Sequence, residues 1–85
     1  MRKLEQAEKE RIDFILEDKL CCDLDNIKSD SLIRDDLGAD SLDEIEICME
    51  LEKEFNISIP DSLMEEVKTV QDLYDTVEKV LNIEL

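Results

Sequence analysis

Histidine and tryptophan are absent from this 85-residue sequence, which also has only one glycine, one proline and 4% aromatic residues. Without histidine, a serine or cysteine nucleophile lacks its usual base, and a mixed cysteine and histidine zinc site is excluded. So few glycines and aromatics disfavour hairpins and strands. A chain this short also buries only about 60–65% of its unfolded surface, which leaves no deep pocket by default. These shortages favour an all-α protein and argue against an enzyme.

Positive charge is scarce as well, because ten Lys and Arg residues face 25 Asp and Glu residues, for a net charge of -15. Such a field repels nucleic acids and anionic lipids and attracts basic proteins, so we expect a basic protein partner and no nucleic acid. No apolar run approaches the length of a membrane span, and the first residues lack a signal-peptide core. The odd set Cys21, Cys22 and Cys48 is typical of reduced thiols. We therefore expect a soluble, cytoplasmic protein.

The spacing of apolar residues predicts a small bundle of three main helices plus one short helix, in a single domain over residues 1–85. The expected helices span residues 4–20, 41–55 and 61–66, and a last one starts at Thr69. Leu4 and Ala7 extend the buried face of the first helix, and Asn56 and Pro60 end the second. The threonine hydroxyl caps the last helix, whose expected buried residues are Val70, Leu73, Val77 and Val80.

The connection over residues 21–40 is long and carries the single glycine, together with several Asp, Asn and Ser residues. Its apolar residues are expected to pin it to the core. These anchors are Leu24, Ile27, Leu32, Ile33 and Leu37. Loops of this length are uncommon without a function.

The second helix carries two apolar faces when its residues are placed 100° apart. The larger stripe, assigned to the core, consists of Ile47, Cys48, Leu51 and Phe55. On nearly the opposite side lie Leu42, Ile45 and Met49, which we call the docking strip and expect to face outward. An exposed apolar strip is a candidate interaction surface.

Acidic residues surround the docking strip. Residues 35–55 hold nine carboxylates against Lys53 alone. Any single one of them is explained as part of a solvated helix face, but the cluster as a whole favours a binding role. The candidate partner-docking residues are Asp36, Asp40, Leu42, Asp43, Ile45, Glu46, Met49, Glu50 and Glu52. No window fits an EF-hand calcium loop, so we expect no metal site.

Ser41 is one of three serines in an Asp-Ser-Leu tripeptide, with Ser31 and Ser62. Residues 41–44 fit a capping box, which favours a purely structural cap. Asp40 can instead accept the first amide bonds and leave the Ser41 hydroxyl free, although Asp61 can do the same for Ser62. Capping chemistry alone therefore leaves Ser41 and Ser62 equivalent. A helix start also suits a phosphodiester, because its free amides favour an anion.

The run LIRDDLGADSLDEIEICMELEKEFNISIP over residues 32–60 resembles the acyl carrier proteins of bacterial fatty-acid synthesis. Their hallmark, Leu-Gly-x-Asp-Ser-Leu at the start of an acidic helix, occurs here only around Ser41. The similarity continues through TVQDL at residues 69–73. Cys48, where the family usually has an aliphatic residue, and the pair Cys21 and Cys22 depart from the pattern.

This resemblance implies that Ser41, flanked by Asp40 and Leu42, carries 4'-phosphopantetheine transferred from coenzyme A by a phosphopantetheinyl transferase. The arm would hold acyl groups as thioesters for the basic surfaces of acyl-synthesis and acyltransferase enzymes, and the helices would shelter the acyl chain. The protein itself would catalyse nothing, and we expect a monomer. Two alternatives stay open: a specialised carrier of an aminoacyl or polyketide cargo, and an unmodified acidic adaptor that docks through its second helix.

Overall fold

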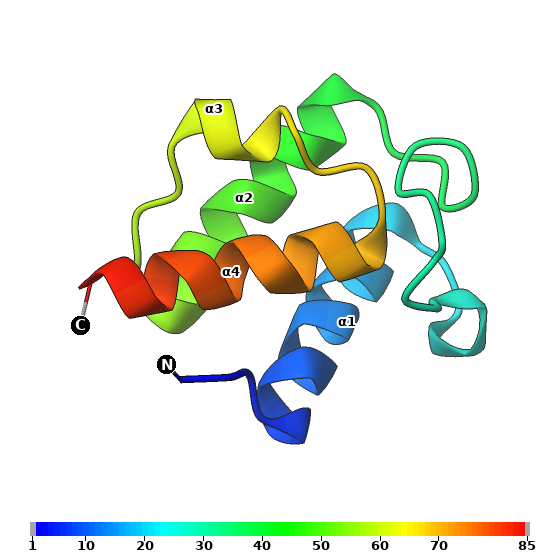
Figure 1. Cartoon of the computed structure of the whole chain (residues 1–85). Coiled ribbons are helices and arrows are strands. Elements are labelled where there is room, and N and C mark those ends of the chain that lie inside the picture. The colour runs from blue at the N-terminus through cyan, green and yellow to red at the C-terminus, as the bar shows by residue number, and fades with distance from the viewer. Residues whose placement is uncertain (1, 85) are drawn as a thin grey trace.

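The computed structural model describes residues 2–84 as a set of packed helices (Figure 1). Its elements are α1 (Gln6–Leu20), the short 3-10 helix η1 (Leu24–Asn26), α2 (Ser41–Phe55), α3 (Asp61–Met64) and α4 (Val70–Glu84). The described residues form no strand and contain one isolated bridge, between Leu32 and Thr69. The predicted all-α fold, with three main helices and a short one, is confirmed. Within residues 2–84, no helix has the length and apolar character needed to cross a membrane.

The start of α1 lies later than predicted. The helix begins at Gln6 because Glu5 is extended and its backbone N–H donates to the Glu8 carboxylate at 2.9 Å. Leu4 is nevertheless buried, just ahead of the helix. Ala7 was expected to face the core and is exposed, so that part of the prediction is wrong. Within α1 the buried residues are Ile12, Ile15 and Leu16, so the core-facing stripe of the helix begins after its first turn.

The other helix ends follow local backbone chemistry. Asn56 ends α2 as predicted, in a left-handed conformation with φ of 53°. α3 ends at Met64, earlier than predicted, because the next turn bonds the Val67 N–H to the Met64 carbonyl at 3.1 Å. The hydroxyl of Thr69 accepts the Asp72 N–H at 3.1 Å, which confirms the predicted cap of α4.

The core is aliphatic and is built from one face of each long helix. Its largest fully buried side chains are Ile12, Leu16, Ile47, Leu51, Leu73, Val70 and Val77. On α2 the predicted core stripe is confirmed, since Ile47 and Leu51 are buried and Cys48 and Phe55 pack against them. All four α4 residues predicted to be buried are buried. The opposite face of α2 is therefore left for solvent or a partner.

The connection over residues 21–40 packs against the start of α4, where the Ile33 N–H donates to the Lys68 carbonyl at 2.9 Å. Ile33 and Leu37 are buried and Ile27 is partly buried, as predicted for anchors. Leu32 is 38% exposed and is not a core anchor. Its side chain points outward because side chains alternate along an extended segment and its neighbour Ile33 points inward. The side chain of Leu24 lies outside the described part of the chain.

A phenol joins α4 to α1 beneath the surface. The hydroxyl of Tyr74 donates to the Asp13 carboxylate, and the Lys9 ammonium lies 5.7 Å from the centre of the ring. Tyr74 is buried, and burial together with the adjacent carboxylate raises its pKa well above the usual value. Burial also raises the pKa of Asp13. The pair therefore favours a protonated phenol in the folded protein.

Because Tyr74 is the single tyrosine, its ionisation can be followed directly by ultraviolet absorbance. We expect the folded protein to form no phenolate near pH 10, the usual tyrosine pKa, because the folded state holds this proton more tightly than the unfolded chain. Stability should consequently fall as the pH rises above about 10, and Tyr74→Phe should lose that part of the pH dependence. A phenolate signal near pH 10 in protein that is still folded would contradict this assignment.

Candidate functional site

A tight turn leads the chain into α2 and places Ser41 as the first helical residue. Gly38 has a φ of 79°, which glycine adopts without steric cost, and its N–H donates to the Arg34 carbonyl at 3.0 Å. The carboxylate of Asp40 accepts the Asp43 N–H at 2.9 Å, and Asp43 accepts the Asp40 N–H at 3.1 Å. Asp40 is thus the helix cap, and the exposed Ser41 hydroxyl is released from that role.

Ser31, the first of the other two serines, is integrated into the connection. Its side chain is 7% exposed. Its hydroxyl accepts the Lys28 N–H at 3.0 Å and donates to the Asn26 carbonyl at 3.3 Å. These two bonds stabilise the turn after η1 and leave the hydroxyl inaccessible to a modifying enzyme.

Ser62 is exposed but stands in a different context from Ser41. α3 has four residues, starts after Pro60 and has no side-chain cap. Asp61 lies inside the helix, so it does not take the capping role that the sequence left open for it. The glycine turn and the aspartate cap therefore occur together only before Ser41.

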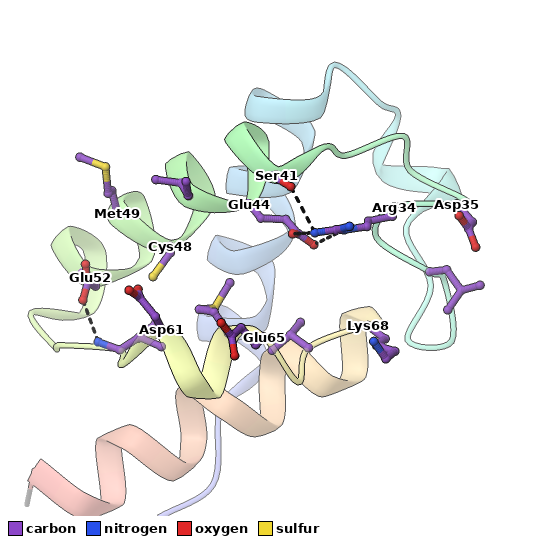
Figure 2. A pocket seen from close by; sticks show the side chains of 15 residues that line it. Arg34, Asp35, Ser41, Glu44, Cys48, Met49, Glu52, Asp61, Glu65 and Lys68 are labelled. Atoms are coloured by element: carbon purple, nitrogen blue, oxygen red, sulfur yellow. Dashed lines mark hydrogen bonds and ion pairs between the residues drawn. The ribbon is translucent and has the colours of Figure 1, made fainter.

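Arg34, a residue that was not predicted to belong to the site, lies beside Ser41. The Arg34 guanidinium makes two bonds to the Glu44 carboxylate, Nη2 to Oε1 at 2.6 Å and Nε to Oε2 at 3.1 Å (Figure 2). The same Nη2 lies 3.5 Å from the Ser41 Oγ. The carboxylate raises the pKa of Arg34 further, so the guanidinium stays charged. A sequence signal existed: Arg34 is the sole cation between Lys28 and Lys53.

An open groove of about 870 Å³ lies between α2, α3 and the connection, with Ser41, Arg34 and Glu44 among its lining residues (Figure 2). Its apolar lining consists of Leu32, Ile45, Cys48, Met49, Ile59, Met64 and Val67. Composition alone predicted no deep pocket. The α3 helix that borders this groove has only four residues.

The docking strip faces outward, as the helical spacing predicted. Leu42, Ile45 and Met49 are 63%, 57% and 53% exposed, whereas Leu51 on the opposite face is fully buried. Ile45 and Met49 also line the groove, and Leu42 does not. The outer apolar face of α2 therefore continues from the helix surface into the groove.

The carboxylates predicted for docking differ in how they are engaged. Asp36, Asp43 and Glu52 each accept a backbone N–H, at 2.7, 3.1 and 2.7 Å, and so shape the local backbone. One oxygen of Glu50 lies 3.8 and 3.7 Å from two lysine ammonium groups. Glu46 is exposed. Some carboxylates around the docking strip therefore stabilise the backbone, and together they give this surface a strong negative charge.

The thiol of Cys48 lies on the groove wall and is half-buried. Burial, with smaller effects from Glu52 and Asp61, raises the pKa of this thiol to about 11. It is therefore protonated and weakly nucleophilic near neutral pH. Across residues 2–84, no group of three or more His, Cys, Asp or Glu side chains is arranged to hold a metal ion.

Comparisons with known proteins cover the whole site. The family model described as phosphopantetheine attachment site matches residues 10–77. An acyl carrier protein of Porphyromonas gingivalis is 45% identical over 78 residues, which cover 92% of this chain and 99% of that protein. An acyl carrier protein of Chlorobium phaeobacteroides is 46% identical over 71 residues, 84% of this chain and 91% of that one.

The fold has a counterpart among solved structures. A protein from Mycobacterium tuberculosis assigned as an acyl carrier protein superposes with a TM-score of 0.76 at 31% sequence identity. The superposition covers 91% of this chain and 97% of the other. The likeness therefore extends over most of the fold described above.

Proposed function

The chain belongs to the acyl carrier proteins, which carry acyl groups on a phosphopantetheine arm, and we propose that Ser41 is the residue to which this arm is attached. One observation carries the choice of residue: Asp40 caps α2, so the exposed Ser41 hydroxyl at the first helical position is not used as a cap. Acyl carrier proteins are carriers and not catalysts. We infer that this chain likewise presents acyl groups to enzymes and catalyses no step itself.

The surroundings of Ser41 fit the phosphodiester that joins 4'-phosphopantetheine to a serine. The start of α2, a helix of 15 residues, concentrates the positive end of the helix dipole there. Asp40 fixes the backbone before the serine, and the exposed Leu42 side chain borders it on the other side. When bound, the group supplies a terminal thiol that holds acyl groups as thioesters.

The composition of the groove favours fatty acyl groups as the cargo. Its apolar wall, from Ile45 and Met49 on α2 to Ile59 and Met64 across from them, suits an aliphatic chain better than a charged aminoacyl group. This supports a role in fatty-acid synthesis. The free thiols in the described residues support a reducing compartment, for which we propose the cytoplasm.

Intact mass spectrometry tests the attachment. Purified protein incubated with coenzyme A and a phosphopantetheinyl transferase should gain the mass of one phosphopantetheine. Peptide mapping should then place that mass on the peptide that contains Ser41. Protein that gains no mass with an active transferase would instead fit an unmodified acidic adaptor, and the proposal would fail.

For the partner enzymes we propose basic surfaces that dock on α2. The exposed docking strip supplies apolar contact, and Glu46 and Glu50 supply negative charge beside it. Asp36 and Asp43 add charge near the N-terminus of the helix. Asp36 also accepts the Leu32 N–H in the connection, and Asp43 accepts the N–H of the capping residue Asp40. A phosphopantetheinyl transferase would use the same end of α2 because Ser41 lies there.

Partner affinity should fall as the salt concentration rises. The excess of acidic residues over residues 35–55 acts through solvent, and exposed charges are screened beyond about 8 Å at physiological ionic strength. A titration calorimetry series with one partner enzyme, from low to high sodium chloride, measures the trend. A dissociation constant that stays constant across the series would contradict electrostatic docking.

A further inference from the structure

We propose that Arg34 binds the phosphodiester of the arm and that Glu44 holds the guanidinium in place for this contact. The inference rests on the proposed attachment at Ser41. It goes beyond that attachment by assigning an anion-binding residue that lies in the connection, seven residues before the serine. The proposed contact between Arg34 and the phosphodiester does not involve the capping residue Asp40.

The geometry supplies the first reason. The Arg34 Nη2 lies 3.5 Å from the Ser41 Oγ, the atom to which the phosphorus becomes bonded. A guanidinium carries five N–H donors, and the two bonds to Glu44 leave others for an anionic oxygen. Arg34 thus already stands beside the position of the phosphodiester, and guanidinium groups bind phosphate oxygens well.

The charge distribution supplies the second reason. Modification adds a negative charge at Ser41, within a stretch of nine carboxylates over residues 35–55. The other cation of this region, Lys53, lies near the far end of α2. Lys68 also lines the groove, but it is the Arg34 guanidinium that contacts Ser41 and can offset the new charge there.

The exposure of the ion pair supplies the third reason. The Arg34 side chain is 61% exposed, and an ion pair this open to water contributes little to folding. Figure 2 shows the guanidinium reaching across to Glu44 and Ser41 at the groove. Holding a long side chain in one position costs conformational entropy, and a contact with the modified serine would explain why Arg34 is held there. The same contact would keep the base of the arm on the groove side.

A thermodynamic cycle isolates the proposed contact. We would compare the melting temperatures of the apo and the phosphopantetheinylated forms for the wild type and for Arg34→Gln. The part of the Glu44 pair that does not depend on the arm is lost in both forms of the variant, so that part cancels in the cycle. We expect modification to lower the melting temperature of Arg34→Gln by about 2 °C more than that of the wild type at low salt.

Arg11→Gln is the matched control, because Arg11 makes a similar exposed ion pair with Glu54, at 2.6 Å. It changes the net charge by the same amount on another part of the surface. The cycle for this variant should show no excess shift. The phosphorus NMR resonance of the arm should likewise move in Arg34→Gln and stay in place in Arg11→Gln, a readout that a purely structural role of Arg34 would leave unchanged.

Glu44→Gln supplies a further variant in which Arg34 keeps its charge and loses the carboxylate that holds it in place. Modification should lower the melting temperature of this variant more than that of the wild type, but less than that of Arg34→Gln. Equal shifts in the wild type and Arg34→Gln, with an unmoved phosphorus resonance, would overturn the proposal. So would an Arg34→Gln protein that the transferase leaves unmodified while it modifies the wild type, since Arg34 would then act in the transfer. Failure of the wild type itself to be modified would refute the attachment instead.

Discussion

Ser41→Ala should abolish the mass gain with coenzyme A and transferase completely, whereas Ser31→Ala and Ser62→Ala should each gain one phosphopantetheine. Alanine has no side-chain oxygen to which the phosphodiester could be bonded. The structure adds why the other two serines are poor acceptors. Ser31 is buried and makes two hydrogen bonds, and Ser62 lies in a single-turn helix without the glycine turn and aspartate cap.

The serine panel carries its own folding control. Ser41→Ala removes an exposed hydroxyl that caps nothing, so its melting temperature should match the wild type. Ser31→Ala removes a buried hydroxyl with two partners and should cost about 1 kcal/mol, yet it should still be modified. A Ser41→Ala protein that still gains one phosphopantetheine would move the attachment site elsewhere. Loss of modification in Ser62→Ala alone would do the same.

The helices were predictable because the apolar period of each long helix is continuous and lies between clear stop signals. On α2, Ile47 and Leu51 face the core and Met49 faces outward, as spacing alone indicated. The ends were less predictable. Leu4 is apolar and buried, but it precedes α1, since a single reciprocal contact of Glu5 with Glu8 decides where the helix begins. The spacing of apolar residues predicts which side chains are buried, but it does not predict where a helix is capped.

The site was predictable only in part. Capping patterns left Ser41 and Ser62 equivalent, and the family motif separated them. The structure adds a physical difference, because Asp40 caps a long helix while Asp61 lies inside a short one. The pair of Arg34 with Glu44 spans ten residues and depends on how the turn at residues 34–39 folds back, which no helical or strand period encodes. The same holds for the groove, whose walls come from α2, α3 and the connection.

Leu51→Glu should unfold the protein, or nearly so, while Met49→Glu should keep its stability within about 0.5 kcal/mol of the wild type. Leu51 is fully buried in an aliphatic core, where a carboxylate finds no water. The penalty for that burial approaches the total stability of a domain this size, about 5–8 kcal/mol. Met49 is 53% exposed, so the same replacement there places its carboxylate in solvent.

The two sites lie two residues apart on one helix, so helix propensity and net charge change almost equally and only the facing differs. Met49→Glu should nevertheless weaken docking, because it puts a charge on the exposed apolar strip that Leu42 and Ile45 share. Met49 also lines the groove, so docking should be measured with the modified protein free of any acyl group, which removes cargo effects from the comparison. Thermal melts in which Met49→Glu is as damaging as Leu51→Glu would contradict the exposure of this face. Unchanged partner affinity in a folded Met49→Glu would instead refute the docking strip and leave the fold and the attachment at Ser41 intact.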